Sequence, residues 1–105
     1  MILENCYAIN TNELCDEAYD GQQALDLVIK NIEQNNYDAC DYALILMDCN
    51  MPRMDGYESS RRIREFCYEN SIVQPIITAV TGHLEQDYVK KAVKCGINQI
   101  LGKPI

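Results

Sequence analysis

The feature that most constrains the fold is an apolar run that ends abruptly at an acid. Residues 43–47 read Ala-Leu-Ile-Leu-Met, Asp48 follows directly, and a turn rich in Asn, Pro and Gly comes next. An uninterrupted apolar run bounded by turn residues is typical of a strand buried on both faces of a parallel sheet. Because ligands of open α/β sheets bind beyond the carboxyl ends of such strands, we expect the Asp48 carboxylate at the mouth of a cleft. An Asp that merely begins the turn is the other interpretation of this stretch alone.

The composition indicates one globular domain with an acidic surface. The chain has 105 residues, of which 48% are hydrophobic, so it can bury a core. Sixteen acids against nine bases give a net charge of −7. This charge argues against binding to nucleic acids or anionic membranes, since both contacts need a surplus of Lys and Arg. No stretch approaches a membrane span and no signal-peptide pattern is present, so we expect a cytoplasmic domain.

The six cysteines form neither a metal-binding motif nor a recognisable disulfide framework. No Cys-x-x-Cys pair occurs, and no His lies at zinc-ligand spacing from a Cys. Several of the cysteines lie inside apolar segments, where a free Cys behaves as a small hydrophobic residue. We expect reduced thiols, as in the cytoplasm. The six are Cys6, Cys15, Cys40, Cys49, Cys67 and Cys95.

Strand-like and helix-like segments alternate along the chain. Asp20 and Asp55 each precede a Gln or Glu by three residues, which is a helix-start signature close to a capping box. Gly96 follows a segment with acids early and lysines late, as expected at a helix terminus. The expected strands are residues 14–19, 42–47, 76–80 and 97–101, and the expected helices are residues 1–9, 21–34, 56–69 and 84–95. This alternation predicts the α/β class with a parallel sheet.

Three of the expected strands end at a polar residue of a different kind. Asp48, Thr81 and Lys103 each follow an apolar strand directly. In a parallel sheet all three would point to the same edge. A carboxylate, a hydroxyl and an ammonium that converge there are typical of a functional site, although each residue alone would be an ordinary surface or turn residue.

At these residues the sequence resembles the receiver domain of two-component response regulators and hybrid histidine kinases. Residues 44–56 (LILMDCNMPRMDG) resemble the family's phosphoacceptor segment, and residues 16–25 look like the stretch that leads into its second helix. Residues 77–83 and 101–105 are similar to its switch-hydroxyl and Lys-Pro segments. The four segments lie in the family's order and cover nearly the whole chain. The resemblance implies a flavodoxin-like, three-layer α/β sandwich around a parallel sheet.

The resemblance also implies a role for each site residue. Asp48 would be the phosphoacceptor, whose carboxylate attacks the phosphorus of a phosphohistidine. Thr81 would act as the switch that hydrogen-bonds the phosphoryl group, and Lys103 would bind its charge. Mg²⁺ would be held by Asp48 and by the backbone carbonyl of Asn50. The partner would be a histidine kinase or a histidine phosphotransfer protein, and the domain would be a signalling module, not an enzyme.

The start of the chain departs from the family's pattern. The family begins with an apolar strand that ends in a pair of Mg²⁺-binding acids, and nothing here matches that pair. Residues 1–9 are expected to close a helix instead, with Leu3, Cys6 and Tyr7 on one face. The chain would then offer Mg²⁺ only Asp48 and one carbonyl, too few ligands for a tight site.

The other end of the chain and one strand also differ from the family. The chain stops just past Lys103-Pro104, before the family's last helix. Ile100 occupies the position where the family commonly has an aromatic that couples to the switch hydroxyl. We therefore expect residues 1–105 to be a receiver domain truncated at both ends, lacking the first strand and the last helix. Because the missing strand lies at the centre of the family's sheet, open strand edges would make this chain fold poorly by itself.

Two other functions compete with that of a phosphoacceptor. A degenerate receiver would take no phosphate and would act only as a docking module. An aspartate-nucleophile phosphohydrolase also places an Asp at a strand end, but it needs a second acid two residues on, where this chain has Asn50. We interpret Asp55 as a helix cap, His83 as an exposed loop residue and Cys49 as a bystander thiol, since no base that would lower its pKa flanks it.

Overall fold

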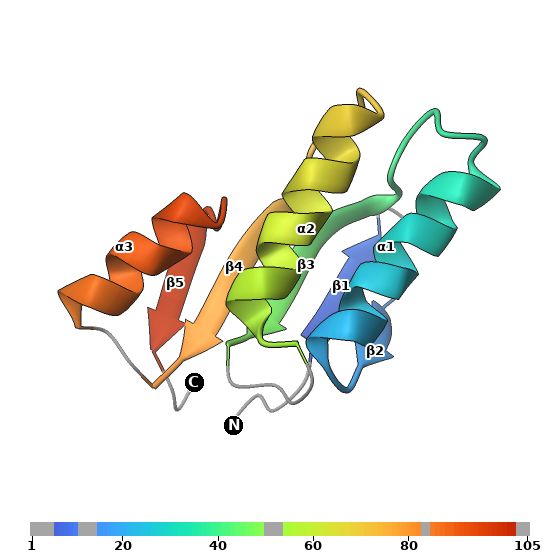
Figure 1. Ribbon diagram of the computed structural model, residues 1–105. Helices are drawn as coiled ribbons and strands as arrows, with labels where there is room; N and C mark the ends of the chain where they lie inside the picture. Colours follow the sequence, from blue (N-terminus) through green and yellow to red (C-terminus); the bar gives the residue numbers. More distant parts are fainter. Residues whose placement is uncertain (1–5, 11–14, 50–53, 83–84, 103–105) are drawn as a thin grey trace.

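Five strands and three helices make up the part of the chain that the computed structural model describes, which is residues 6–10, 15–49, 54–82 and 85–102. Figure 1 shows their arrangement. In chain order the elements are β1 (Cys6–Asn10), β2 (Cys15–Ala18), α1 (Gly21–Gln34), β3 (Tyr42–Asp48), α2 (Gly56–Glu69), β4 (Ile76–Thr81), α3 (Gln86–Lys94) and β5 (Gln99–Gly102). None of the helices described here combines the length and the apolar character needed to cross a membrane.

The first two helices begin at the predicted caps. The backbone N–H of Gln23 donates to Asp20 Oδ1 (2.8 Å), and the Gln23 side chain accepts in return from the backbone N–H of Tyr19 (2.9 Å). At α2, the backbone N–H of Glu58 donates to Asp55 Oδ1 (2.9 Å). Each cap satisfies a donor that the first turn of a helix leaves without a partner. The interpretation of Asp55 as a cap is confirmed.

The third helix ends as predicted at a glycine. Gly96 has a φ of 83°, a left-handed conformation that favours glycine. The N–H of Gly96 donates to the carbonyl of Val93 (3.1 Å), and the N–H of Ile97 donates to the carbonyl of Ala92 (3.1 Å), which is the Schellman pattern of bonds. Because Ile97 completes this helix end, β5 begins two residues later than the sequence predicted, at Gln99.

The strands form one sheet in the order β2-β1-β3-β4-β5. β3 pairs in parallel with β4, and β4 with β5. β1 pairs antiparallel with both of its neighbours, β2 and β3. It follows that β2, β3, β4 and β5 run in one direction and that β1 alone runs in the other. The prediction of a parallel sheet is therefore right for four strands and wrong for the fifth.

The helix predicted at residues 1–9 is wrong for the described residues of that range. Cys6–Asn10 is a strand, and it occupies the central place of the sheet that was expected to be vacant. Its burial alternates: Cys6 and Ala8 are 1% and 2% exposed, whereas Tyr7 and Ile9 are half-buried. This period of two is that of a strand with one face on the core.

The direction of β1 follows from the short connection to β2. Only residues 11–14 separate the two strands, and a parallel connection needs a crossover of about a dozen residues. The pair is therefore antiparallel, with Cys6 opposite Ala18. β1 cannot be the family's first strand, since that strand runs parallel to the others. It nevertheless gives β2 and β3 a hydrogen-bonding partner, which removes the open edges that were expected to impair folding.

The core lies between the sheet and the helices. All three helices cover the same face of the sheet, and no described helix covers the opposite face (Figure 1). The described residues thus supply the sheet and one of the two helical layers of the expected sandwich. Apolar side chains of every helix and of the central strands meet in this layer, among them Val28, Ile32, Ile45, Met47, Ile63, Cys67, Ile77, Ala79 and Ala92.

Arg64 of α2 joins the helix to the edge of the sheet where β4 and β5 begin. Its Nε donates to the carbonyl of Gly96 (2.8 Å) and its Nη1 to the carbonyl of Pro75 (2.7 Å). The side-chain oxygens of Gln74 and Asn98 accept from Nη1 (2.9 Å) and Nη2 (2.5 Å). One guanidinium therefore satisfies two backbone carbonyls at loops far apart in the sequence, which its rigid fork allows.

We expect Arg64→Met to lower the free energy of unfolding by about 2 kcal/mol, because it leaves the part-buried carbonyls of Pro75 and Gly96 without their charged donor. Urea unfolding followed by circular dichroism measures the change. Arg62→Met is the matched control, since Arg62 is half-exposed and bonds only Glu58 one turn away; its effect should stay within about 0.5 kcal/mol. Equal effects of the two substitutions would contradict the role of Arg64.

Candidate functional site

Asp48 and Thr81 lie together at the carboxyl ends of adjacent parallel strands. Asp48 is the last residue of β3 and is paired with Val80 of β4, and Thr81 is the next residue of β4. The backbone N–H of Cys49 donates to the carbonyl of Val80 (3.2 Å), so the pairing of the two strands continues past Asp48. The prediction that Asp48 and Thr81 share one edge of the sheet is confirmed.

Both side chains are largely enclosed, so the expectation that the Asp48 carboxylate faces solvent at the mouth of a cleft is wrong. Asp48 is 4% exposed and Thr81 is 2% exposed, and each has an interaction within the protein. A carboxylate at this depth needs hydrogen-bond or charge partners, which distinguishes it from an Asp that begins an ordinary surface turn. The other predicted site residues, Lys103 and Asn50, lie outside the described residues, as does His83.

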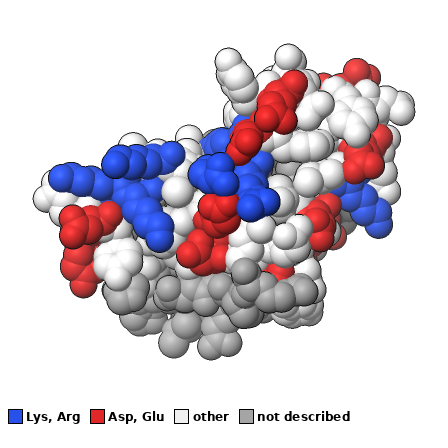
Figure 2. All heavy atoms as spheres, viewed as in Figure 1, with Lys and Arg blue, Asp and Glu red and all other residues white. Residues whose placement is uncertain are grey.

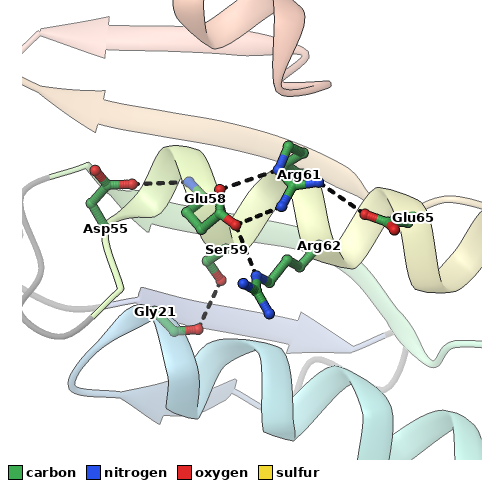
Figure 3. A network of polar contacts seen from close by, with 7 residues as sticks. All are labelled: Gly21, Asp55, Glu58, Ser59, Arg61, Arg62 and Glu65. Carbon is green, nitrogen blue, oxygen red and sulfur yellow. Dashed lines mark hydrogen bonds and ion pairs between the residues drawn. The ribbon is translucent and has the colours of Figure 1, made fainter.

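The first turns of α1 and α2 meet at this edge of the sheet. The backbone N–H of Gly21 donates to the carbonyl of Met54 (2.8 Å), and the Ser59 hydroxyl donates to the carbonyl of Gly21 (2.9 Å), as Figure 3 shows for Ser59. Gly56 packs on the end of β3 so closely that a Cβ there would lie 2.6 Å from the carbonyl oxygen of Asp48. These contacts fix the two helix starts relative to Asp48. The sequence interpretation did not identify any of them.

Tyr57 is a further residue of this edge that sequence reasoning missed. It is 5% exposed, and Cys49 and Thr81 are among the residues that influence the pKa of its hydroxyl. Burial, and next the neighbouring Cys49, raises the pKa of Tyr57 to about 12, so the hydroxyl is neutral at physiological pH and can both donate and accept. The Lys91 ammonium of α3 lies 4.5 Å from the centre of the Tyr57 ring, within the range of a cation–π contact.

A signal for Tyr57 was present in the sequence. It directly follows the Asp-Gly pair that starts α2, and α2 follows the strand that ends at Asp48. A residue in the first turn of such a helix lies at the carboxyl edge of the sheet. The apolar periodicity of α2 places its inner face at later residues, and it therefore did not single out Tyr57.

The exposed face of α2 carries a chain of ion pairs. Glu58 accepts from Arg61 Nη2 (2.6 Å) and Arg62 Nε (2.8 Å), and Arg61 Nη1 reaches Glu65 (3.0 Å), as drawn in Figure 3. Hydrogen bonds from Arg61 and then Arg62 lower the pKa of Glu58 to about 2. Because solvent screens these pairs, they contribute little to stability. In Figure 2 most of the basic side chains of this view lie over α2 and α3, although the whole chain is acidic.

The described residues do not form a complete site for Mg²⁺. Within this part of the chain, no group of three or more His, Cys, Asp or Glu side chains could hold a metal ion. Mg²⁺ requires near-octahedral oxygen coordination. Asp16 of β2, which β1 separates from β3, accepts a hydrogen bond from the Tyr42 hydroxyl (2.6 Å). In this arrangement Asp48 is the carboxylate at the end of β3, the central strand of the sheet.

An open α/β sheet with an enclosed carboxylate and a hydroxyl at adjacent strand ends is the arrangement expected of a receiver domain. The family model of the response regulator receiver domain matches residues 2–105, and the chain belongs to this family. Probable histidine kinase 2 of Oryza sativa subsp. indica is 42% identical over 93 residues. The match covers 84% of this chain but 9% of that protein, so the chain spans a small part of this curated relative.

Solved structures agree with this assignment. The receiver domain of the Arabidopsis thaliana histidine kinase CKI1, crystallised with Mg²⁺, superposes with a TM-score of 0.70 at 35% identity. That match covers 80% of this chain and 61% of the CKI1 chain. The receiver domain of Saccharomyces cerevisiae Ssk1, in complex with the histidine phosphotransfer protein Ypd1, gives a TM-score of 0.71 at 29% identity, with 84% and 59% of the two chains covered. The flavodoxin-like receiver fold is therefore confirmed.

Proposed function

We propose that this chain is a phosphoacceptor module in a two-component phosphorelay, with Asp48 as the residue that takes the phosphoryl group. The observation that carries the proposal is the enclosed Asp48 side chain at the end of β3, with Thr81 ending the adjacent parallel strand β4. A carboxylate oxygen of Asp48 would attack the phosphorus of a phosphohistidine. The bond between phosphorus and the imidazole nitrogen breaks, the imidazole leaves and takes up a proton, and an aspartyl-phosphate remains.

The proposed donor is a histidine kinase or a histidine phosphotransfer protein. Ypd1 bound to the receiver of Ssk1 supports this partner by analogy. Thr81 would donate a hydrogen bond to the phosphoryl group. Lys103, as the cation that binds phosphoryl charge, and the Asn50 carbonyl, as a metal ligand, stay predictions from the resemblance. No disulfide joins any of the six cysteines, all of which are described, and this supports the proposed reducing, cytoplasmic location.

The proposal predicts that Asp48→Asn abolishes phosphoryl transfer. The 105-residue chain is mixed with a histidine phosphotransfer protein phosphorylated on its histidine, in the presence of Mg²⁺, and the intact mass is measured. Borohydride trapping of the acyl phosphate, followed by peptide mass spectrometry, locates the modified residue. Asp38→Asn is the matched control, since Asp38 is an exposed acid outside the site, and this variant should accept phosphate as the unsubstituted chain does. Phosphorylation of Asp48→Asn would contradict the assignment.

A degenerate receiver that only docks to its partner is the second candidate. The observation that favours it is the incomplete set of Mg²⁺ ligands among the described residues. The same mixture separates the two functions when binding is measured by calorimetry beside phosphoryl transfer. Binding without any modification of the unsubstituted chain would favour the docking module. In either case we propose that the chain is a signalling domain without catalytic turnover of its own.

A further inference from the structure

An open groove of about 390 Å³ runs between α1 and α2, and every residue that lines it belongs to one of these two helices. Leu25, Ile29 and Phe66 supply its apolar surface. The other lining side chains are charged and come from α2, and they are Arg61, Arg62, Glu65 and Glu69. Figure 3 shows Arg62 extending from α2 toward α1. The groove therefore combines an apolar floor with a charged rim, which is the composition of a surface that binds another protein.

The geometry of the groove suits a helix. Leu25 and Ile29 are four residues apart on α1, and Arg62 and Phe66 are four residues apart on α2, so a row of side chains flanks the groove on each side. Helices pack by placing such a row of one helix between the rows of another. The eight-residue rise from Arg61 to Glu69 is about 12 Å, a little over two helical turns. A third helix can therefore lie along the groove and contact α1 and α2 together.

A strained residue adds an aromatic ring to this surface. Tyr37 has a φ of 62°, a left-handed conformation that is an outlier for a bulky side chain. Its N–H donates to the carbonyl of Ile32 (2.9 Å), and the N–H of Asp41 donates to Asn31 Oδ1 (2.7 Å), so the loop after α1 is held from both sides. The Tyr37 ring is 49% exposed, and its centre lies 6.4 Å from that of Phe66. Strain of this kind is typical of binding sites, and Tyr is among the residues that dominate binding energy at interfaces.

The charges of the rim favour a basic partner. Arg61 pairs with Glu58 and Glu65, and Arg62 pairs with Glu58. The carboxylate of Glu69 is exposed and forms no hydrogen bond or ion pair with any described residue. Two arginines and three glutamates leave one negative charge on this strip, and that charge is at Glu69. An anion would have to displace a glutamate from an arginine, whereas a cation can pair with Glu69 directly.

We propose that the groove between α1 and α2 binds a basic amphipathic helix of a partner protein. Apolar residues one turn apart on that helix cover Leu25, Ile29 and Phe66, and a Lys or Arg beside them pairs with Glu69. The net charge of −7 attracts such a helix over a longer range and raises its association rate. Every lining residue lies beyond the first turn of its helix, so the groove does not include Asp48. The proposal holds whether or not Asp48 takes up phosphate.

The probe for the test is a stapled helical peptide of about 18 residues, or five turns, with leucines along one face and lysines on the other. One matched peptide carries glutamates in place of the lysines, and a second carries serines in place of the leucines. Titration of the ¹⁵N-labelled 105-residue chain gives each dissociation constant and maps the amides that shift. The first peptide should bind at least about tenfold more tightly than either control and should shift amides of α1 and α2. Equal binding of a control peptide, or shifts confined to other elements, would overturn the proposal.

Glu69→Gln should weaken binding of the lysine peptide about threefold, because it removes one ion pair. Asp87→Asn is the matched control, since it removes the same charge from an exposed acid of α3 and should leave the dissociation constant unchanged. Equal weakening by the two substitutions would show that only the overall charge attracts the peptide, which contradicts a pair at Glu69. Ile29→Gln should weaken binding at least about fivefold, whereas Val93→Gln, at an exposed valine of α3, should not. The serine peptide tests the same apolar contact without any change in the chain.

Tyr37→Gly separates binding from stability. Glycine adopts a φ of 62° without strain, so the urea midpoint should stay unchanged or rise, while the lysine peptide should bind about fivefold more weakly. Undiminished binding would overturn the part of the proposal that concerns Tyr37. Sedimentation velocity of the chain without peptide tests the other occupant, a second copy of this chain, and we expect a monomer. A dimer that the lysine peptide dissociates would assign the groove to that second copy and would overturn the proposal.

Discussion

Gly21→Ala and Gly56→Ala should each destabilise the chain by about 3 kcal/mol or more, at the upper end of the cost of overpacking. A Cβ on Gly21 would lie 2.0 Å from the carbonyl oxygen of Met54, which already accepts the Gly21 N–H. A Cβ on Gly56 would lie 2.6 Å from the carbonyl oxygen of Asp48 and 2.9 Å from Cys49 Cα. Both obstacles are backbone atoms, so relief requires movement of the helix start and not of a flexible side chain.

Gly82→Ala is the matched control for both substitutions. Gly82 follows β4 at the same edge of the sheet, and a Cβ there would meet nothing within 4 Å. Its effect should stay within about 0.5 kcal/mol, as for other surface substitutions. Urea unfolding of the three variants gives the free energies. A loss with Gly82→Ala as large as with Gly21→Ala would show that these glycines matter through backbone flexibility and not through close approach.

Helices α1 and α2 were predictable because local interactions determine their limits. Asp20 and Asp55 cap them from adjacent positions, and both helices begin and end where the sequence predicted. The position of Asp48 was predictable for a related reason, since turn residues directly after an apolar strand determine where that strand ends. The joint placement of Asp48 and Thr81 needed only the rule that parallel strands share an edge.

β1 and Tyr57 could not be predicted in the same way. The strand conformation of β1 and the surroundings of Tyr57 depend on partners that are distant in the sequence. Five residues without caps do not distinguish a helix end from a strand, and only the sheet shows that they fill the place between β2 and β3. Tyr57 reads as an apolar residue in the pattern of α2, and the influence of Thr81 on it depends on where β4 ends. The close approaches of Gly21 to the start of α2 and of Gly56 to the end of β3 depend likewise on how distant elements meet.

Ala8→Asp should reduce the free energy of unfolding by about 4 kcal/mol or more, since it buries a carboxylate without a partner at the centre of the sheet. Total stability for a chain of this size is roughly 5–15 kcal/mol, so a loss of this size removes a large fraction of it. Ala8 is 2% exposed and lies on β1 opposite Ile45 of β3. Ala43→Asp is the matched control, because Ala43 is an exposed alanine of β3, and it should cost about 1 kcal/mol or less.

The same substitution discriminates between the strand and the helix that the sequence predicted. In that helix Leu3, Cys6 and Tyr7 would face the core, and Ala8 would point away from it, so Ala8→Asp would be tolerated and Tyr7→Asp would not. In the strand Ala8 is buried on the helical side of the sheet, whereas Tyr7 is half-buried on the other side. Ala8→Asp should therefore lower the urea midpoint more than Tyr7→Asp does. The reverse order would restore the helix and reopen the vacant centre of the sheet, because β2 and β3 would then lack the strand that pairs with both.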